Sequence, residues 1–125
     1  GVSVYKRVWD KTITKRYFEY PFPSWYYSWR AGLTEMVTGR DSMLHELQAE
    51  PWPPTGIKEA SLEEQDKSMN AVRLAERIDY GVDTGFKDID LWGGEWWYWR
   101  KVKFNDDSLW QTTKAKMSEY GQYSK

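Results

Sequence analysis

The chain has 125 residues, a formal net charge of −1 and no cysteine. This length suits a single domain, and the lack of cysteine excludes a disulfide framework, thiolate catalysis and thiolate metal sites. Both ends are basic and the middle is acidic, unlike the net basic domain expected of a nucleic-acid-binding protein. No apolar run approaches the 18 residues of a membrane-spanning helix, so any contact with membrane head groups is expected to be peripheral.

Aromatic residues dominate the composition. Nine Trp, nine Tyr and four Phe make up 18% of the chain. Tyr and Trp are enriched at interfaces, because one end of the side chain is apolar and the other end can stay hydrated. We therefore predict more ring surface than the few aliphatic residues can enclose, with the remainder covered by other molecules.

Residues 1–23 are expected to form a basic, aromatic N-terminal arm. The opening Val-Ser-Val favours a strand, although the spacing of Val4, Val8 and Ile13 also permits a helix. Pro21 and Pro23 argue against regular helix before Ser24.

A helical part is predicted over residues 24–80. Ser24 is a candidate N-cap, and an apolar stripe follows at helical spacing, formed by Trp25, Trp29, Leu33 and Met36. Gly39 ends this helix, or the helix continues to Glu50, where Pro51 stops it. The proline-rich segment 51–56 is a stiff connector, in which Trp52 is expected to pack onto a neighbouring surface.

A second helix is predicted from Ser61 to Tyr80, because Ser61 and Glu64 form a capping box and Gly81 follows as a stop. The aspartates of the next loop do not fit a calcium loop, since a loop starting at Asp79 would place Thr84 where glycine is required.

A β-hairpin is predicted over residues 88–104, with Gly93-Gly94 as its turn. In the second strand, Trp96 and Tyr98 would lie on one face and Trp97 and Trp99 on the other. A final helix is expected over residues 107–121. The overall prediction is a mainly α chain with a short β-hairpin (α+β), three to four helices and a partly extended, non-compact shape, as one small domain or an extended subunit.

No catalytic, cofactor-binding or metal-ligating residue is predicted. His45 is the only histidine, and it has no second ligand at metal-binding spacing. The glycines do not form a phosphate-binding loop, and no nucleophile motif is present. Neighbouring acids such as Glu63 and Glu64 are expected in any acidic segment, so the chain is not predicted to be an enzyme.

These features favour a structural accessory subunit that contacts other protein subunits. The favoured setting is a mitochondrial inner-membrane complex, either a respiratory complex or ATP synthase, because a start at Gly1 is expected after removal of a transit peptide, as well as from a tag. The alternative is a carbohydrate-binding module with exposed Trp and Tyr; a third outcome is that the aromatic clusters form an ordinary core. The predicted interface residues are Trp25, Trp29, Trp52, Trp92, Trp96, Trp97, Tyr98 and Trp99.

Overall fold

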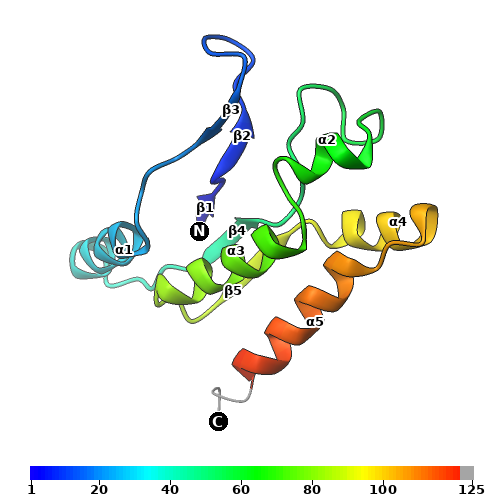
Figure 1. Ribbon diagram of the computed structural model, residues 1–125. Helices are drawn as coiled ribbons and strands as arrows, with labels where there is room; N and C mark the ends of the chain where they lie inside the picture. Colours follow the sequence, from blue (N-terminus) through cyan, green and yellow to red (C-terminus); the bar gives the residue numbers. More distant parts are fainter. Residues whose placement is uncertain (122–125) are drawn as a thin grey trace.

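The fold is organised around a three-stranded parallel sheet, accompanied by a separate two-stranded antiparallel hairpin (Figure 1). It is seen in a computed structural model that describes residues 1–121. The parallel sheet has the order β1-β4-β5, and the hairpin joins β2 to β3. The elements are β1 (Val2–Val4), β2 (Arg7–Trp9), β3 (Tyr17–Glu19), α1 (Ser24–Thr38), β4 (Leu44–Gln48), α2 (Leu62–Asp66), α3 (Ala71–Asp83), β5 (Ile89–Trp92), α4 (Gly94–Phe104) and α5 (Ser108–Gly121).

The chain is therefore a compact α/β protein with many long-range contacts. The predicted helical content is present, but the prediction of a single short β-hairpin and that of a partly extended, non-compact shape were both wrong, because a parallel sheet gathers the helices into one compact unit. Strands and helices alternate along the sequence, and each parallel pair of strands is connected through helical segments, as parallel pairing requires.

Strand β4 occupies the centre of the sheet, between β1 and β5. The sequence left this segment open to a helical interpretation, because Leu44 and Leu47 are three residues apart. In the structure, the pairing register shifts between these two leucines. Such a bulge lets residues three apart lie on the same face of a strand, and both leucines are fully buried.

The helices α1 and α3 cover one face of the sheet. Val4, Leu44, Leu47 and Phe86 form a buried cluster there, with Tyr27 and Ala31 of α1 packed against it. A second cluster joins α3, α4 and α5; its buried residues are Ala49, Met69, Leu74, Ile78, Trp96, Trp97 and Leu109.

The predicted hairpin over residues 88–104 is instead a strand followed by a helix. Gly93 has φ 149°, which ends β5, and α4 starts at the next residue. Strand alternation was the wrong interpretation of Trp96 to Trp99. Aromatic residues occupy all four consecutive positions, so the pattern fits the two-residue period of a strand and the 3.6-residue period of a helix equally well. The helix carries Glu95 in its first turn and Lys101 and Lys103 in its last turn, which complements a helix dipole.

Some other boundaries agree with the sequence and some do not. Pro23, not Ser24, is the N-cap of α1, and α3 continues past the predicted stop at Gly81 to Asp83. Gly39, in the left-handed conformation at φ 66°, ends α1. The Ser61 hydroxyl accepts a hydrogen bond from the Glu64 amide, as the capping box predicted. The helix expected from Ser61 to Tyr80 is divided into α2 and α3, because Asn70 caps a new helix by accepting a hydrogen bond from the Arg73 amide.

Two buried polar side chains hold the elements together. The Gln48 amide accepts hydrogen bonds from the Lys6 and Arg7 amides, both at 2.9 Å, and donates to the Arg7 carbonyl at 2.7 Å. Arg100 of α4 is 4% exposed and bonds Asp66 at 2.7 Å and Asp106 at 2.6 Å. The Gln48 contacts hold the turn after β1 against the central strand. The Arg100 contacts hold α4 to α2, through Asp66, and to the turn before α5, through Asp106.

Adding a methyl group at Gly93 should destabilise the protein, whereas the same change at Gly94 should not. A Cβ at Gly93 would lie 2.7 Å from the Ala49 carbonyl group, and the positive φ adds backbone strain. We expect Gly93→Ala to lower the free energy of unfolding by about 2–4 kcal/mol.

Gly94→Ala is the matched control, because a Cβ added at Gly94 would have no neighbouring atom within 4 Å. It should leave the free energy of unfolding unchanged or raise it by up to about 1 kcal/mol. Chemical denaturation of both variants measures the difference, and equal stabilities would contradict the strand-to-helix junction described here.

Candidate functional site

The face of the sheet opposite α1 and α3 is polar, and it is the first feature that points to a site. Side chains alternate along strands, so the residues that point away from α1 and α3 share this face: Ser3, Tyr5, Glu46, Asp90, Trp92 and, just after β4, Glu50. Gln48 shares it too, but is fully buried beneath the turn that follows β1. Parallel sheets are usually covered on both faces. Ligands commonly bind outside the carboxyl ends of parallel strands, which is where Glu50 and Trp92 lie.

An aromatic pocket adjoins this carboxyl edge. It has a volume of about 780 Å³ and is lined by Glu50, Ile57, Lys58, Trp92, Glu95, Trp96, Tyr98, Trp99, Val102 and Lys103. The rings of Trp96 and Trp99 are stacked, with centroids 4.3 Å apart and planes inclined by 26°. Tyr98 and Trp92 are 58% and 47% exposed. The pocket therefore combines apolar ring surface with two carboxyl groups, the composition typical of a small-molecule site.

The helical period explains why α4 supplies so much of the lining. Glu95, Trp99 and Val102 recur at intervals of four and three and so share one side of the helix. Trp97 points elsewhere: its ring is 6% exposed and its Nε1 donates to the Ala49 carbonyl at 2.7 Å. Trp97 thus anchors α4 while its neighbours line the pocket.

Glu50 is the carboxyl group most affected by this environment. The Trp92 Nε1 donates a hydrogen bond to Glu50 Oε1 at 3.0 Å. Burial raises the pKa of Glu50; the Trp92 hydrogen bond lowers it, and the negative charge of Glu95 raises it. The net direction is upward, so Glu50 keeps its proton to a higher pH than an ordinary glutamate.

Glu46 shows the opposite tendency on the same face of the sheet. It accepts a hydrogen bond from the Tyr5 hydroxyl at 2.8 Å. This bond, together with one from Ser3, lowers the pKa of Glu46. Glu46 on β4 and Glu50 just after it therefore have pKa values shifted in opposite directions.

The predicted interface residues are divided among four places: the aromatic pocket, α1, the contact of Trp52 with Tyr5, and the core, where Trp97 lies. Trp92, Trp96, Tyr98 and Trp99 meet in the aromatic pocket. Trp25 and Trp29 lie on α1, where they are 65% and 57% exposed. Trp52 packs edge-on against Tyr5, with ring centroids 5.2 Å apart, and Trp96 and Trp97 are buried. Sequence reasoning missed Tyr5, Glu46 and Glu50; the alternation of Glu46, Gln48 and Glu50 ahead of Pro51 was the signal of a strand with one polar face.

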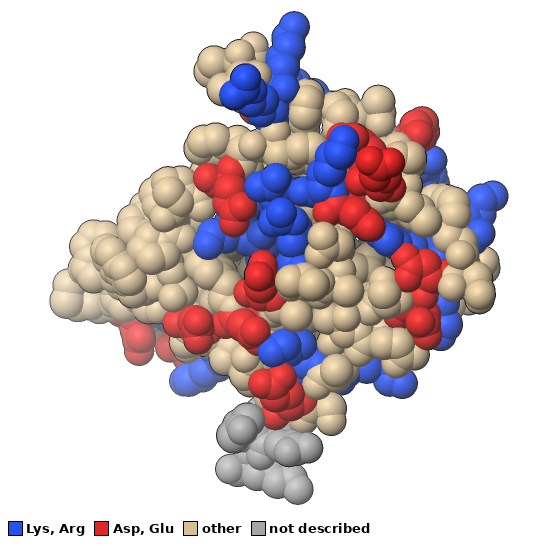
Figure 2. Space-filling view, in the orientation of Figure 1, with Lys and Arg blue, Asp and Glu red and all other residues tan. Residues whose placement is uncertain are grey.

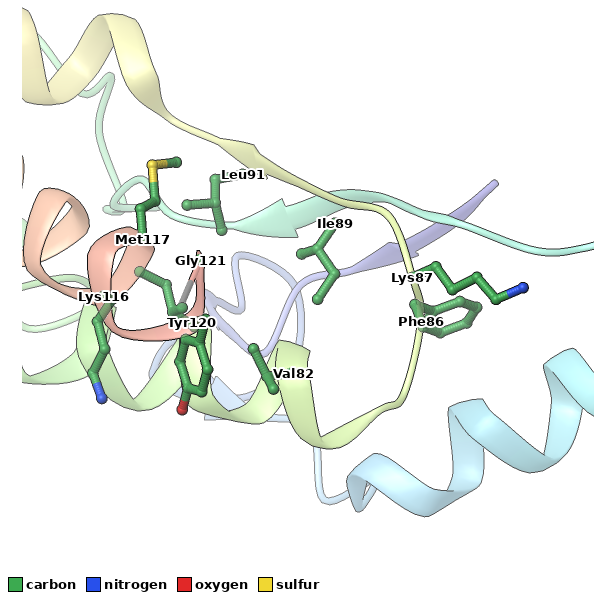
Figure 3. Close-up of a pocket in the computed structure, with 10 residues that line it drawn as sticks. Val82, Phe86, Lys87, Ile89, Leu91, Lys116, Met117, Tyr120 and Gly121 are labelled. Carbon is green, nitrogen blue, oxygen red and sulfur yellow. The ribbon is translucent and has the colours of Figure 1, made fainter. Parts of the chain in front are cut away.

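A second cavity lies between α3, β5 and α5. Figure 3 shows Val82, Ile89, Leu91, Met117 and Tyr120 around it. Its volume is about 410 Å³, and the lining has no acidic residue. The Lys116 ammonium is already paired with Asp79 at 2.7 Å. This cavity is a largely apolar groove, and we do not assign it chemistry.

The described part of the chain shows neither a metal-binding cluster nor a membrane-spanning helix. In residues 1–121, no three His, Cys, Asp or Glu residues are arranged to hold a metal ion. Within the same range, no helix is both long enough and apolar enough to cross a membrane.

Comparison with known proteins gives no relative: no family model, no curated protein and no solved structure matches this chain. Its function is therefore argued from the site alone.

The shifted pKa of Glu50 predicts a pH-dependent effect on stability. A carboxyl group whose pKa is raised on folding favours the folded state below its unfolded pKa of about 4.3, and this contribution is lost as the pH rises through the folded pKa. Glu50→Gln removes the titration. The stability of the variant relative to the parent should therefore increase as the pH rises above about 4.

Urea denaturation at a series of pH values measures this difference. The exposed Glu63 provides a control substitution, Glu63→Gln. A Glu50→Gln difference that stays constant with pH, or that falls as the pH rises, would contradict the environment described for Glu50.

Proposed function

We propose that the chain binds a carbohydrate at the carboxyl edge of its parallel sheet. The observation that carries this proposal is the aromatic pocket, in which Trp92, Tyr98 and the stacked pair of Trp96 and Trp99 stand beside Glu50. The partly exposed rings of Trp92, Tyr98 and Trp99 offer stacking surface to the apolar face of a sugar. Carboxylate oxygens accept hydrogen bonds from hydroxyl groups. The pocket therefore offers contacts both to the apolar face of a sugar ring and to its hydroxyl groups.

The hydrogen-bonding state of the pocket supports a ligand with hydroxyl groups. The Trp96 Nε1 is buried and has no acceptor among residues 1–121. Unsatisfied buried donors are uncommon in native proteins and require an explanation. A sugar oxygen in the pocket would supply such an acceptor after a small adjustment of the ring.

The proposal extends to acid–base chemistry on the bound sugar. Glycoside hydrolysis needs one carboxyl group that holds its proton and one that is ionised. Glu50 has a raised pKa and Glu46 a lowered one. Four residues of extended strand span about 13 Å, which is too far for two carboxyl groups that act on one glycosidic bond. Glu95, which lines the pocket with Glu50, is therefore the proposed partner of Glu50.

Truncating Trp92 should weaken carbohydrate binding. Trp92→Ala removes both stacking surface and the hydrogen bond to Glu50, so we expect affinity for the best oligosaccharide on a glycan array to fall at least about tenfold, the equivalent of 1.4 kcal/mol. Trp25→Ala removes an equally large exposed ring from α1 and should have no effect. No binding by the parent chain, or equal loss in both variants, would refute the proposal.

A nitrophenyl glycoside of the bound sugar tests for cleavage. Turnover that is lost in Glu50→Gln, while binding is kept, would assign a catalytic role to Glu50. Binding without turnover would restrict the site to recognition.

The second candidate function is a structural role in a larger assembly, which is the interpretation favoured from composition. The specific observation that favours it is α1, which has no buried residue. Its exposed apolar side chains are Trp25, Trp29, Leu33, Met36 and Val37. Contiguous apolar surface of this kind marks interaction sites on soluble proteins.

Polar substitutions on α1 should separate assembly from folding. Trp29→Ser combined with Met36→Ser changes two exposed side chains, so each should alter the free energy of unfolding by no more than about 0.5 kcal/mol. If α1 is an interface, the double variant should leave the native particle and migrate as a 14.9 kDa monomer. Unchanged particle mass, measured by light scattering on the natively purified protein, would exclude α1 as that interface.

A further inference from the structure

Two arginines are buried to nearly the same extent, and they differ in their partners. Arg100 is 4% exposed and is paired with both Asp66 and Asp106. Arg77 is 5% exposed, yet residues 1–121 offer its guanidinium no hydrogen bond or ion pair, and its Nε is an unpartnered buried atom. Buried charges are normally paired, because removing an ion from water is costly. Arg77 therefore lacks an anionic partner.

A second cation lies over Tyr80, which follows Arg77 by three residues on α3 and so lies on the same side of that helix. The Lys6 ammonium sits 4.1 Å from the centre of the Tyr80 ring. Burial, followed by the positive charge of Arg77, lowers the pKa of Lys6. Lys6 has no carboxylate within ion-pair distance in the described part of the chain. Its backbone is held in place by the hydrogen bond from its amide to Gln48.

The nearest acids do not neutralise this pair. Glu19 and Glu76 favour the charged form of Arg77 only through space. Glu19 is bonded to Arg7 at 3.2 Å, and Arg73 adds a further positive charge that opposes Arg77. Figure 2 shows Lys and Arg side chains gathered near the middle of the viewed face, in the region where α3 and the β2–β3 hairpin lie in Figure 1.

We propose that Arg77 and Lys6 form a binding site for a phosphate-type oxyanion. A guanidinium group presents two parallel N–H donors that match two oxygens of a tetrahedral anion, and an ammonium group adds a point charge. The anion supplies the partner that Arg77 lacks. Lys6 is only partly buried, so the pair of cations is approached from the side of Lys6. The site is separate from the aromatic pocket, whose lining contains neither residue.

Inorganic phosphate tests the site directly on the whole chain. Calorimetric titration at low ionic strength should show saturable binding, and phosphate should raise the melting temperature. Arg77→Met should weaken phosphate binding at least tenfold and abolish this thermal shift. Lys6→Met provides a second variant outside the core and should weaken binding in the same direction. Lys87→Met, which changes an exposed lysine, should bind as the parent does.

The stability of the unliganded protein gives an independent readout. Because Arg77→Met removes an unpaired buried charge, it should raise the melting temperature in phosphate-free buffer. A lower melting temperature would mean that the guanidinium is already satisfied, and would overturn the proposal. No saturable phosphate binding, an equal response to chloride at matched ionic strength, or unaltered binding in both variants would also overturn it.

Phenyl phosphate tests whether the site binds free phosphate or a phosphate group carried by a larger molecule. Tighter binding of phenyl phosphate than of inorganic phosphate supports a phosphate group carried by a larger molecule. Preference for inorganic phosphate supports a site for the free ion.

Discussion

The structure depends above all on the burial of β4 between its two parallel neighbours. Leu44, Leu47 and Ala49 are fully enclosed, and the side-chain amide of Gln48 binds the turn that follows β1. A fully buried amide is tolerable only when its donors and acceptors are satisfied, so Gln48 specifies one placement of the β1–β2 connection. The bulge in β4 then determines which side chains face the helices and which form the polar face.

The proposed binding surface follows from this arrangement. One face of the sheet is occupied by aliphatic side chains under α1 and α3, which leaves Tyr5, Glu46 and Trp92 on the other face. Because the strands are parallel, their carboxyl ends meet at one edge, and the loop after β4 and the start of α4 converge there. Glu50 acquires its raised pKa from burial at this junction. Sheet direction thus explains why residues 50 and 92–103 form one pocket.

Some buried polar groups have hydrogen-bond partners within the protein, and others have none among residues 1–121. Arg100 cross-links α4 to neighbouring segments through two aspartates. The buried Nε of Arg77 and the buried Nε1 of Trp96 lack partners among residues 1–121. Each lies beside a region for which we propose a ligand, an oxyanion at Arg77 and a carbohydrate at Trp96. On α1 the unmet requirement is different: its apolar side chains are exposed to solvent. This exposure supports the separate proposal of a protein partner.

The sequence by itself determined the features that depend on neighbours in the chain. These are the start of a helix after Pro23, the Ser61 capping box, the C-terminal helix and the excess of aromatic rings; an end of α1 at Gly39 was one of two alternatives. Only the tertiary structure decided whether residues 44–48 and 94–104 were strand or helix. Leu44 and Leu47 suit either period until a bulge places them together, and consecutive rings in α4 carry no period. The contact of Glu50 with Trp92, 42 residues away, depends on strand pairing that no local pattern encodes.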